Sequence, residues 1–188
     1  MIVHAVEGCA QTLEACNAFA PPSRTFAVVP PFSVAPDLRG RADHVFCQPA
    51  PRGTGLGVYV ALAMIRRWQP GAFVTVVSPA AVGTSAVELH GLRTIAARSA
   101  DRVAVLDHVA CGTLEALWEL GRRGEPGLLD ILDSLVPLVG TRDEDEAIDY
   151  IYRAYLPVNF ADDIVRRAAD RVVPVTRRPA FRPQHAGA

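Results

Sequence analysis

Hydrophobic positions along the chain follow two different periods, and together they predict an α/β fold. Short apolar runs rich in β-branched and aromatic residues are typical of buried strands. We expect such strands at residues 25–29, 44–47, 72–77, 102–106 and 172–176. Apolar residues recurring three or four positions apart are typical of helices with one buried face. We expect such helices at residues 7–19, 58–68, 87–99, 114–120, 128–135, 143–154 and 164–169.

The order of these elements predicts a three-layer α/β/α sandwich. Strands alternate with helices up to residue 112, and the remainder is mainly helical. The run at 72–77 is apolar almost throughout, which predicts a central parallel strand covered on both faces. We expect one domain over residues 1–176. Residues 177–188 carry proline, arginine and small residues, and we expect them to form a disordered tail.

Several side chains are placed to begin or end the predicted helices. Thr54, Thr113 and Asn159 each precede an apolar helical pattern and are good N-cap residues. Thr141 followed by Glu144 matches the capping-box spacing. The glycine-bearing stretch 121–127 is expected to interrupt the helix that contains residues 114–120.

Composition narrows the class of protein. A chain of 188 residues, 50% of them hydrophobic, can bury a full core. It has no apolar run long enough to span a bilayer, and Glu7 near the N-terminus, without a basic region, argues against a secretory signal. The net charge of −1 argues against a nucleic-acid-binding face. We therefore expect a cytoplasmic protein without a nucleic-acid or membrane partner.

The basic residues and the cysteines exclude further chemistries. All 19 basic residues are arginines, so neither a P-loop lysine nor a Schiff-base lysine is present. The four cysteines show no metal-ligand spacing, and we expect reduced thiols. They are Cys9, Cys16, Cys47 and Cys111.

The segment at residues 47–57 is the strongest candidate for a functional loop. A predicted strand enters it, a predicted helix leaves it, and it contains two prolines and three glycines. A junction of this kind can direct backbone N–H groups and a helix N-terminus at an anion or at the edge of a nucleotide.

Residues 48–54, Gln-Pro-Ala-Pro-Arg-Gly-Thr, resemble the Gln/Glu-Pro-x-x-Arg-Gly/Asn-Thr loop of the sugar-phosphate nucleotidyltransferases. The most similar group is the mannose-1-phosphate guanylyltransferases. Further segments resemble that family in the same order along the chain: 73–80, 114–120, 126–129, 139–141 and 152–165. The resemblance implies a Rossmann-like nucleotidyltransferase fold with a reduced mixed sheet.

The same resemblance implies a nucleotide site in this loop, with a glutamine amide and a backbone group reading the edge of the base. The residues concerned are Gln48, Pro49, Arg52, Gly53 and Thr54. The alternative is a strand-to-helix connection with no ligand, in which Arg52 is solvated and Thr54 is a helix cap.

The chain departs from the family where the family holds phosphates and Mg²⁺. The family's glycine-rich Gly-Gly-x-Gly-x-Arg loop and downstream lysine are missing. Ala81 and Val82 stand where the family has its magnesium-binding Asp and the following His. No Gly-Tyr-Gly segment lies between residues 106 and 112, and no Trp-x-Asp-x-Gly follows residue 175. Because Mg²⁺ needs oxygen ligands, we expect no metal site, no cofactor and no catalytic residue.

Two other groups of side chains suggest chemistry. Asp107 and His108 precede Cys111, which could suggest a nucleophile with its base, but the sequence fixes no geometry between them. The acidic run 143–146 could bind a metal, although carboxylates at a helix start are explained by the helix dipole.

The sequence hypothesis is therefore a nucleotidyltransferase-like pseudoenzyme that keeps nucleotide or nucleotide-sugar binding. One alternative is an interaction or assembly module that pairs with itself or with a full-length paralogue. Another is an active sugar-phosphate nucleotidyltransferase whose missing residues are supplied in trans. The sequence leaves open which nucleotide, which sugar and which oligomeric state apply.

Overall fold

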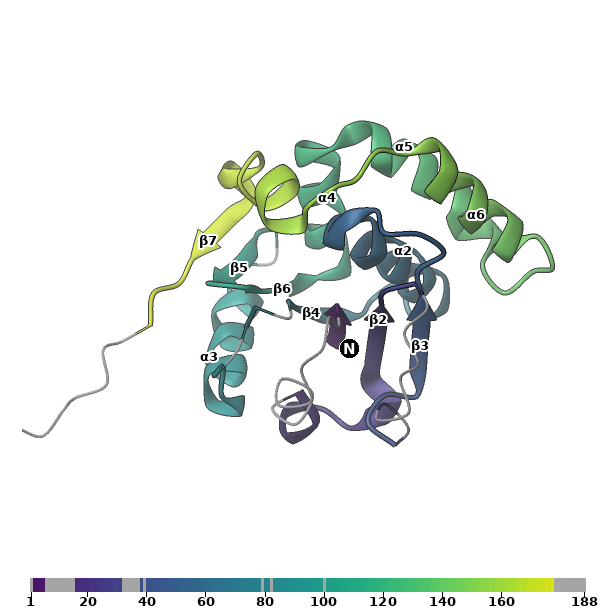
Figure 1. The fold of residues 1–188 in the computed structure, drawn as a ribbon. Coiled ribbons are helices and arrows are strands. Elements are labelled where there is room, and N and C mark those ends of the chain that lie inside the picture. The colour runs from purple at the N-terminus through teal and green to yellow at the C-terminus, as the bar shows by residue number, and fades with distance from the viewer. Residues whose placement is uncertain are drawn as a thin grey trace, which may run out of the picture.

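Within the residues described, one mixed sheet of seven strands organises the computed structural model (Figure 1). The structure describes residues 2–5 (backbone only), 16–31, 38, 40–78, 80–81, 83–99 and 101–177. The strand order is β3-β2-β1-β4-β6-β5-β7. In chain order the strands are β1 (Ile2–Ala5), β2 (Thr25–Val29), β3 (His44–Cys47), β4 (Phe73–Val77), β5 (Val103–Leu106), β6 (Val109–Thr113) and β7 (Val172–Pro174).

Strand β6 makes the sheet mixed. β3, β2, β1 and β4 are parallel neighbours, whereas β6 pairs antiparallel with both β4 and β5. β7 is parallel to β5. The expected central strand at 72–77 is therefore parallel to a neighbour on one side only, and the strand on its other side was not predicted. Because β2, β3, β4 and β5 run in one direction, their carboxyl ends meet at one edge of the sheet.

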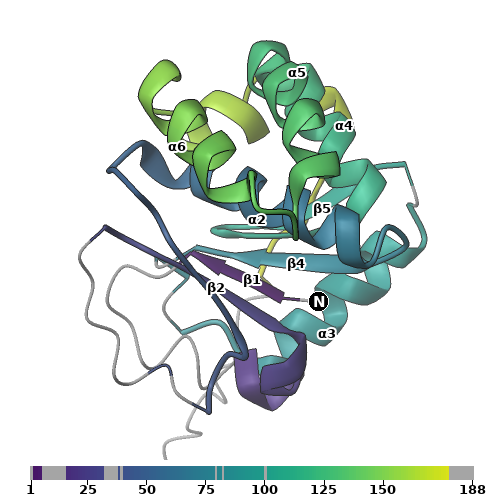
Figure 2. The same ribbon diagram turned by 90° about the vertical axis from the view of Figure 1, so that its right-hand side faces the viewer.

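Helices cover both faces of the sheet, as the expected three-layer architecture requires. Figures 1 and 2 show α2 and α4 on one face, α5 and α6 farther out on that side, and α3 on the opposite face. The helices are α2 (Gly53–Trp68), α3 (Ala86–Ala97), α4 (Leu114–Gly124), α5 (Pro126–Leu135) and α6 (Glu144–Ala154). The Rossmann-like α/β sandwich is confirmed.

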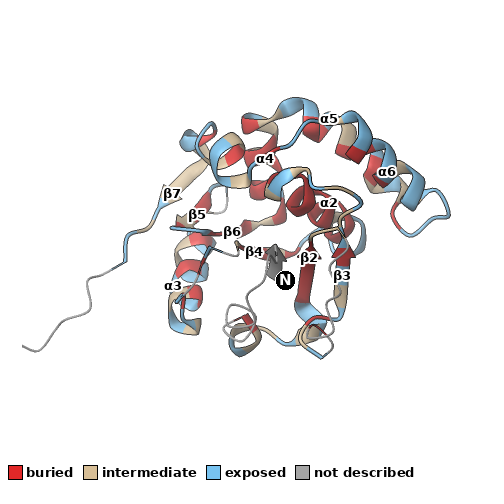
Figure 3. Cartoon of the chain, in the orientation of Figure 1, coloured by how far each residue is buried: buried red, intermediate tan, exposed pale blue. Residues whose placement is uncertain are grey.

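Helix α2 is the centre of the larger core. Every residue from 55 to 65 is buried (Figure 3), because the helix lies between the sheet and the outer helices. The hydroxyl of Tyr59 donates a hydrogen bond of 2.7 Å to the carbonyl oxygen of Leu117 in α4. Gly121, one turn farther along, packs against the Tyr59 ring so closely that a Cβ would collide with it.

The expected interruption at residues 121–127 is confirmed, but it is shorter than predicted, and the Tyr59 contact explains why. α4 runs through Gly121 and ends at Gly124, and α5 begins at Pro126, so the break is confined to Glu125. Glycine at position 121 makes room for an aromatic ring from another helix, and the backbone there stays helical. From the sequence alone, a glycine that makes room for a packed ring cannot be distinguished from a glycine that ends a helix.

Helix capping agrees with the sequence in two places and differs in two others. Thr113 accepts from the N–H of Ala116, and Asn159 accepts from two backbone N–H groups, as expected. Helix α2 begins one residue before Thr54, which is therefore not its N-cap. The expected capping box of α6 is also wrong, because Glu144 accepts from the N–H of Gly140 instead.

The remaining differences concern the last third of the chain. Residues Phe160–Val165 form a π-helical turn, η4, and residues Ala169–Arg171 form a short 3₁₀ turn, η5, in place of one helix at 164–169. The predictions for residues 7–15, for Val82 and for the tail beyond residue 177 lie outside the described residues. Among the helices described, none is both long enough and apolar enough to cross a bilayer.

Candidate functional site

The loop that follows β3 is held against a segment about a hundred positions later in the chain. The Nε of Arg52 donates to the carbonyl oxygen of Tyr152 over 2.8 Å. The hydroxyl of Tyr152 donates to Oε1 of Gln48 over 3.1 Å. The N–H of Val158 donates to the carbonyl oxygen of Arg52 over 2.9 Å. These bonds fix residues 48–54 to α6 and to the connection between α6 and η4.

Gly53 has a left-handed backbone, with a φ of +81°. A Cβ at this position would collide with the carbonyl oxygen of Val158, which also accepts a 2.8 Å bond from the N–H of Gly55. Glycine is therefore needed for an approach between two parts of the protein's own backbone. Thr54 contributes to the same junction, because its Oγ1 accepts from the N–H of Phe160.

The five predicted nucleotide-binding residues thus lie in the loop after β3 and in the first turn of α2, but most of their polar groups have partners within the protein. Arg52 is half-buried and holds a carbonyl group, so it is not the solvated arginine of the alternative interpretation. Burial raises the pKa of Tyr152, which keeps its hydroxyl a donor to Gln48. Among the described residues, the side-chain nitrogen of Gln48 has no hydrogen-bond partner. Pro49 is exposed beside it.

A cavity of about 330 Å³ lies next to this loop, at the carboxyl edge of the sheet. Its walls come from the first turn of α2, the end of β4, the β5–β6 hairpin and η4. Its floor is apolar and includes Val58, Val76 and Val105. The polar residues that line it are Thr54, Ser78, Asp107, His108, Asn159 and Asp162.

The β5–β6 hairpin brings Asp107 and His108 to the cavity. The N–H of Ser78 donates to the carbonyl oxygen of His108 over 3.0 Å, which joins the hairpin to the end of β4. Asp107 adopts a positive φ of 48° at the turn. Neither the hairpin nor β6 was predicted, because residues 109–113 continue directly into a helix and resemble its first turn.

Arg177 fixes the hairpin from the other side. Its Nε lies 3.0 Å from Oδ2 of Asp107 and 3.3 Å from Oε1 of Glu88, and its Nη2 donates to Thr84. The expectation placed Arg177 in a disordered tail, whereas the structure places it in this ion-pair group. No signal in the sequence pointed to that role.

The end of β4 offers no metal ligand where the family resemblance would place one. Ala81 is buried there, and its N–H donates to the carbonyl oxygen of Ser78. Across the part of the chain that the structure describes, no three His, Cys, Asp or Glu side chains are grouped to hold a metal ion. The residues present at this strand end therefore do not fit Mg²⁺.

Cys111 lies apart from the cavity. It belongs to the smaller core on the α3 face, and its sulfur lies 3.1 Å from Oγ1 of Thr75. Burial raises the pKa of its thiol, which keeps the sulfur protonated and weakly nucleophilic. Asp107, His108 and Cys111 therefore form no catalytic arrangement in this structure.

The strand order and the helical layers on both faces of the sheet define a Rossmann-like α/β sandwich with a candidate site at its carboxyl edge. Among solved structures, the chain is similar to the mannose-1-phosphate geranyltransferase from Thermus thermophilus, with a TM-score of 0.72. The match covers 94% of this chain and 73% of that one at 16% sequence identity, a level at which the likeness shows the fold alone.

The sequence comparisons add no family. No protein-family profile matches the chain, and no curated protein matches it.

Proposed function

We propose that this protein binds a sugar or a nucleotide-sugar at the carboxyl edge of its sheet and does not transfer a nucleotide. The observation that carries the proposal is the 330 Å³ cavity, which combines an apolar floor with carboxylate, imidazole, hydroxyl and amide groups. Such groups can both donate and accept hydrogen bonds with sugar hydroxyls, while apolar side chains pack on the ring's C–H face.

The neighbouring loop supports the nucleotide half of the proposal. The side-chain nitrogen of Gln48 remains available as a donor, and Pro49 offers an exposed apolar surface beside it. Thr54 belongs to both the loop and the cavity wall, so one extended ligand can contact both. In this arrangement Arg52 and Gly53 shape the loop, and Gln48 contacts the base.

The charges around the cavity favour binding over transfer. Transfer between two anionic reactants needs cations to neutralise the developing charge on the leaving group. Arg52 is bonded to a backbone carbonyl, Arg177 is paired with Asp107 and Glu88, and Ala81 replaces a metal ligand. None of these residues can neutralise the charge on the leaving group as a metal ion would.

Calorimetric titration with GDP-mannose, mannose 1-phosphate and purine nucleotides tests the binding. We expect saturable heat for at least one ligand, and at least a tenfold loss of affinity in Ala80→Trp, because Ala80 is exposed at the cavity wall. Ala97→Trp adds the same side chain at an exposed position on α3 outside the cavity and is the matched control. No heat at millimolar ligand would refute the binding.

A coupled assay for pyrophosphate release tests the catalytic half. Mannose 1-phosphate, a nucleoside triphosphate and Mg²⁺ are supplied together, and we expect no release above the protein-free rate. Robust turnover that is lost in Ala80→Trp would show that the protein is an active transferase.

An assembly role is the second candidate, and one surface feature favours it. Among the strands described, β3 lies at one edge of the sheet. Val45 in β3 and Trp68 at the end of α2 are half-exposed, with 46% and 50% of their surface accessible. The Trp68 ring lies 5.4 Å from the ring of His44 on the same edge. An open strand beside an aromatic patch can pair with another chain. A mass measurement in solution that gives a monomer at micromolar concentration would count against this role.

A further inference from the structure

A second cavity, of about 210 Å³, lies at the opposite edge of the sheet. Its walls are residues 19–24, the turn between α2 and β4 at residues 69–73, and the side of α3 that carries Arg93. The first cavity lies at the carboxyl ends of the parallel strands and this one at their amino ends, so the sheet separates the two.

The cavity lies beside the amino ends of β2 and β4, since Arg24 precedes β2 and Phe73 is the first residue of β4. Ile2 at the start of β1 pairs with Thr25 on one side and with Thr75 on the other. β4 already begins at Phe73, two residues before that register.

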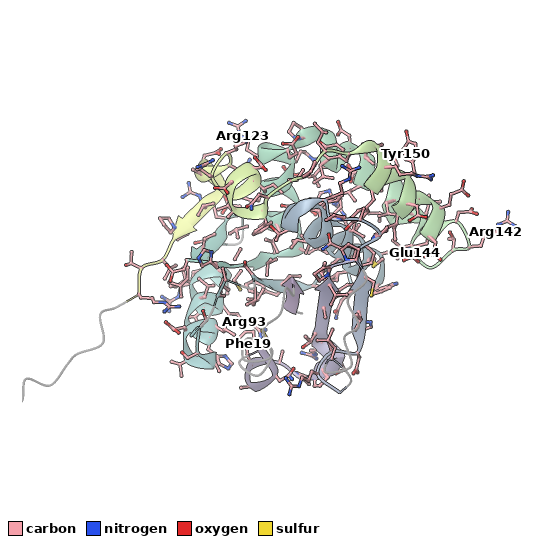
Figure 4. All side chains as sticks on the ribbon, viewed as in Figure 1. Phe19, Arg93, Arg123, Arg142, Glu144 and Tyr150 are labelled. Atoms are coloured by element: carbon pink, nitrogen blue, oxygen red, sulfur yellow. The ribbon has the colours of Figure 1, made fainter. Side chains whose placement is uncertain are left out.

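Hydrogen-bond donors line the cavity, and the two arginines among them are positively charged. Arg24, Arg93 and Gln69 face it from three different elements, and no Asp or Glu is among the described residues that line it. The guanidinium carbon of Arg93 lies 5.6 Å from the centre of the Phe73 ring, which supports its position. Figure 4 shows Arg93 and Phe19 on this part of the molecule.

The two arginines differ from others in the protein. Arg122, Arg167 and Arg177 each lie within 4 Å of two or more carboxylates. Among the residues that the structure describes, neither Arg24 nor Arg93 has a carboxylate within that distance. Two guanidinium groups beside one polar cavity create a positive potential that a bound oxyanion would neutralise.

The size of the cavity limits the ligand. Pockets for drug-sized ligands usually measure about 300–1,000 Å³, and this cavity is smaller. A nucleotide does not fit within it, whereas a tetrahedral oxyanion does. A planar guanidinium fork can donate two parallel hydrogen bonds to a phosphate group.

We propose that this second cavity is a phosphate-binding site, in which Arg24 and Arg93 hold a phosphate dianion and Gln69 donates to it. The dianion is inorganic phosphate or the phosphate end of a small monoester. This site goes beyond the proposed sugar or nucleotide-sugar binding, since it lies at the other edge of the sheet and shares no residue with the first cavity.

Calorimetric titration with inorganic phosphate at constant ionic strength tests the site. We expect saturable millimolar binding that sulfate competes for, and at least a tenfold loss of affinity in Arg24→Gln and in Arg93→Gln. Arg67→Gln and Arg98→Gln are matched controls, because both arginines are exposed, lie outside the cavity and have no carboxylate partner among the described residues. Phenyl phosphate in a parallel titration separates the two sources: tighter binding than phosphate indicates a monoester, and equal or weaker binding indicates the free anion.

Arg24→Lys and Arg93→Lys keep the positive charge but remove the planar guanidinium group. We expect their affinity for phosphate to lie between that of the unmodified protein and that of the glutamine variants. The Ala80→Trp variant blocks the first cavity and should leave phosphate binding unchanged, so the two proposals fail separately. Phosphate that does not bind above a chloride control would overturn the inference, as would equal affinity in the double variant Arg24→Gln/Arg93→Gln.

Discussion

The carbonyl oxygen of Val158 occupies the space that a side chain on Gly53 would need. The two residues lie 105 positions apart, and their contact determines the shape of the loop between β3 and α2. Because this loop borders the candidate site, the geometry of the site depends on a residue that no local pattern connects with it.

Gly53→Ala should lower the free energy of unfolding by about 3 kcal/mol or more, since it combines a positive φ with a backbone collision. Gly83→Ala is the matched control, because Gly83 has the same φ of +81° and open space around it. That control should cost only about 1 kcal/mol. Urea denaturation measures both, and equal losses would show that the contact with Val158 contributes nothing.

Tyr59→Phe should lower the free energy of unfolding by about 1–2 kcal/mol. The substitution removes a fully buried hydroxyl and its hydrogen bond to the carbonyl oxygen of Leu117. Tyr150→Phe removes a hydroxyl from a largely exposed tyrosine and should change stability little. Denaturant midpoints compare the two, and a neutral Tyr59→Phe would contradict the importance of this bond.

The stability of the N-terminal end of α3 should depend on acidic pH. The N–H of Ser85 donates to Glu88, and this bond, with smaller contributions from the Ser85 hydroxyl and from Arg177, lowers the pKa of Glu88 below its ordinary value of 4.5. The stabilisation is therefore complete above pH 4.5 and is lost as the pH falls through the depressed pKa.

Unfolding measured as a function of pH tests this dependence. Glu88→Gln should flatten the acid side of the stability curve, and Ser85→Ala should weaken the same slope by removing the other half of the capping box. If the free energy of unfolding fell as steeply with acidification in both variants as in the unmodified protein, other carboxylates would control the stability at acidic pH.

The described cysteines should differ in their reaction with iodoacetamide. Cys47 is exposed on the edge strand, whereas Cys16 and Cys111 are buried. Burial raises the pKa of Cys16 to about 12 and also raises that of Cys111, so few thiolates are present at neutral pH. Peptide mass spectrometry should find Cys47 modified in the folded protein and the other two only after denaturation. Rapid labelling of Cys111 in the folded state would restore it as a candidate nucleophile.

The sequence predicted elements whose signal is local. Continuous apolar runs indicated β2, β3 and β4, helical periodicity indicated α2 to α6, and the caps at Thr113 and Asn159 rest on contacts within three residues. β6 was missed because Val109–Thr113 is a short strand that runs straight into a helix. The segment is a strand because it pairs with β4, and it is too short for a strand-like alternation of apolar and polar residues to be recognised.

The candidate site was predictable only in part. The loop at residues 48–54 stood out by its prolines and glycines, and the structure places it beside the first cavity. The bond from Arg52 to Tyr152 and the ion pair between Arg177 and Asp107 join residues far apart in the chain. No local sequence pattern indicates that these residues lie close together, so neither interaction could be predicted.

The attachment of the Gly53 loop to Val158 also has a consequence for the order of folding. Closing a chain segment of about a hundred residues costs roughly 4 kcal/mol of entropy before any contact compensates for it. Residues 48–54 are therefore expected to reach their final conformation late, after α6 and η4 have docked. During synthesis on the ribosome, the first cavity would remain incomplete until the chain beyond residue 165 had emerged.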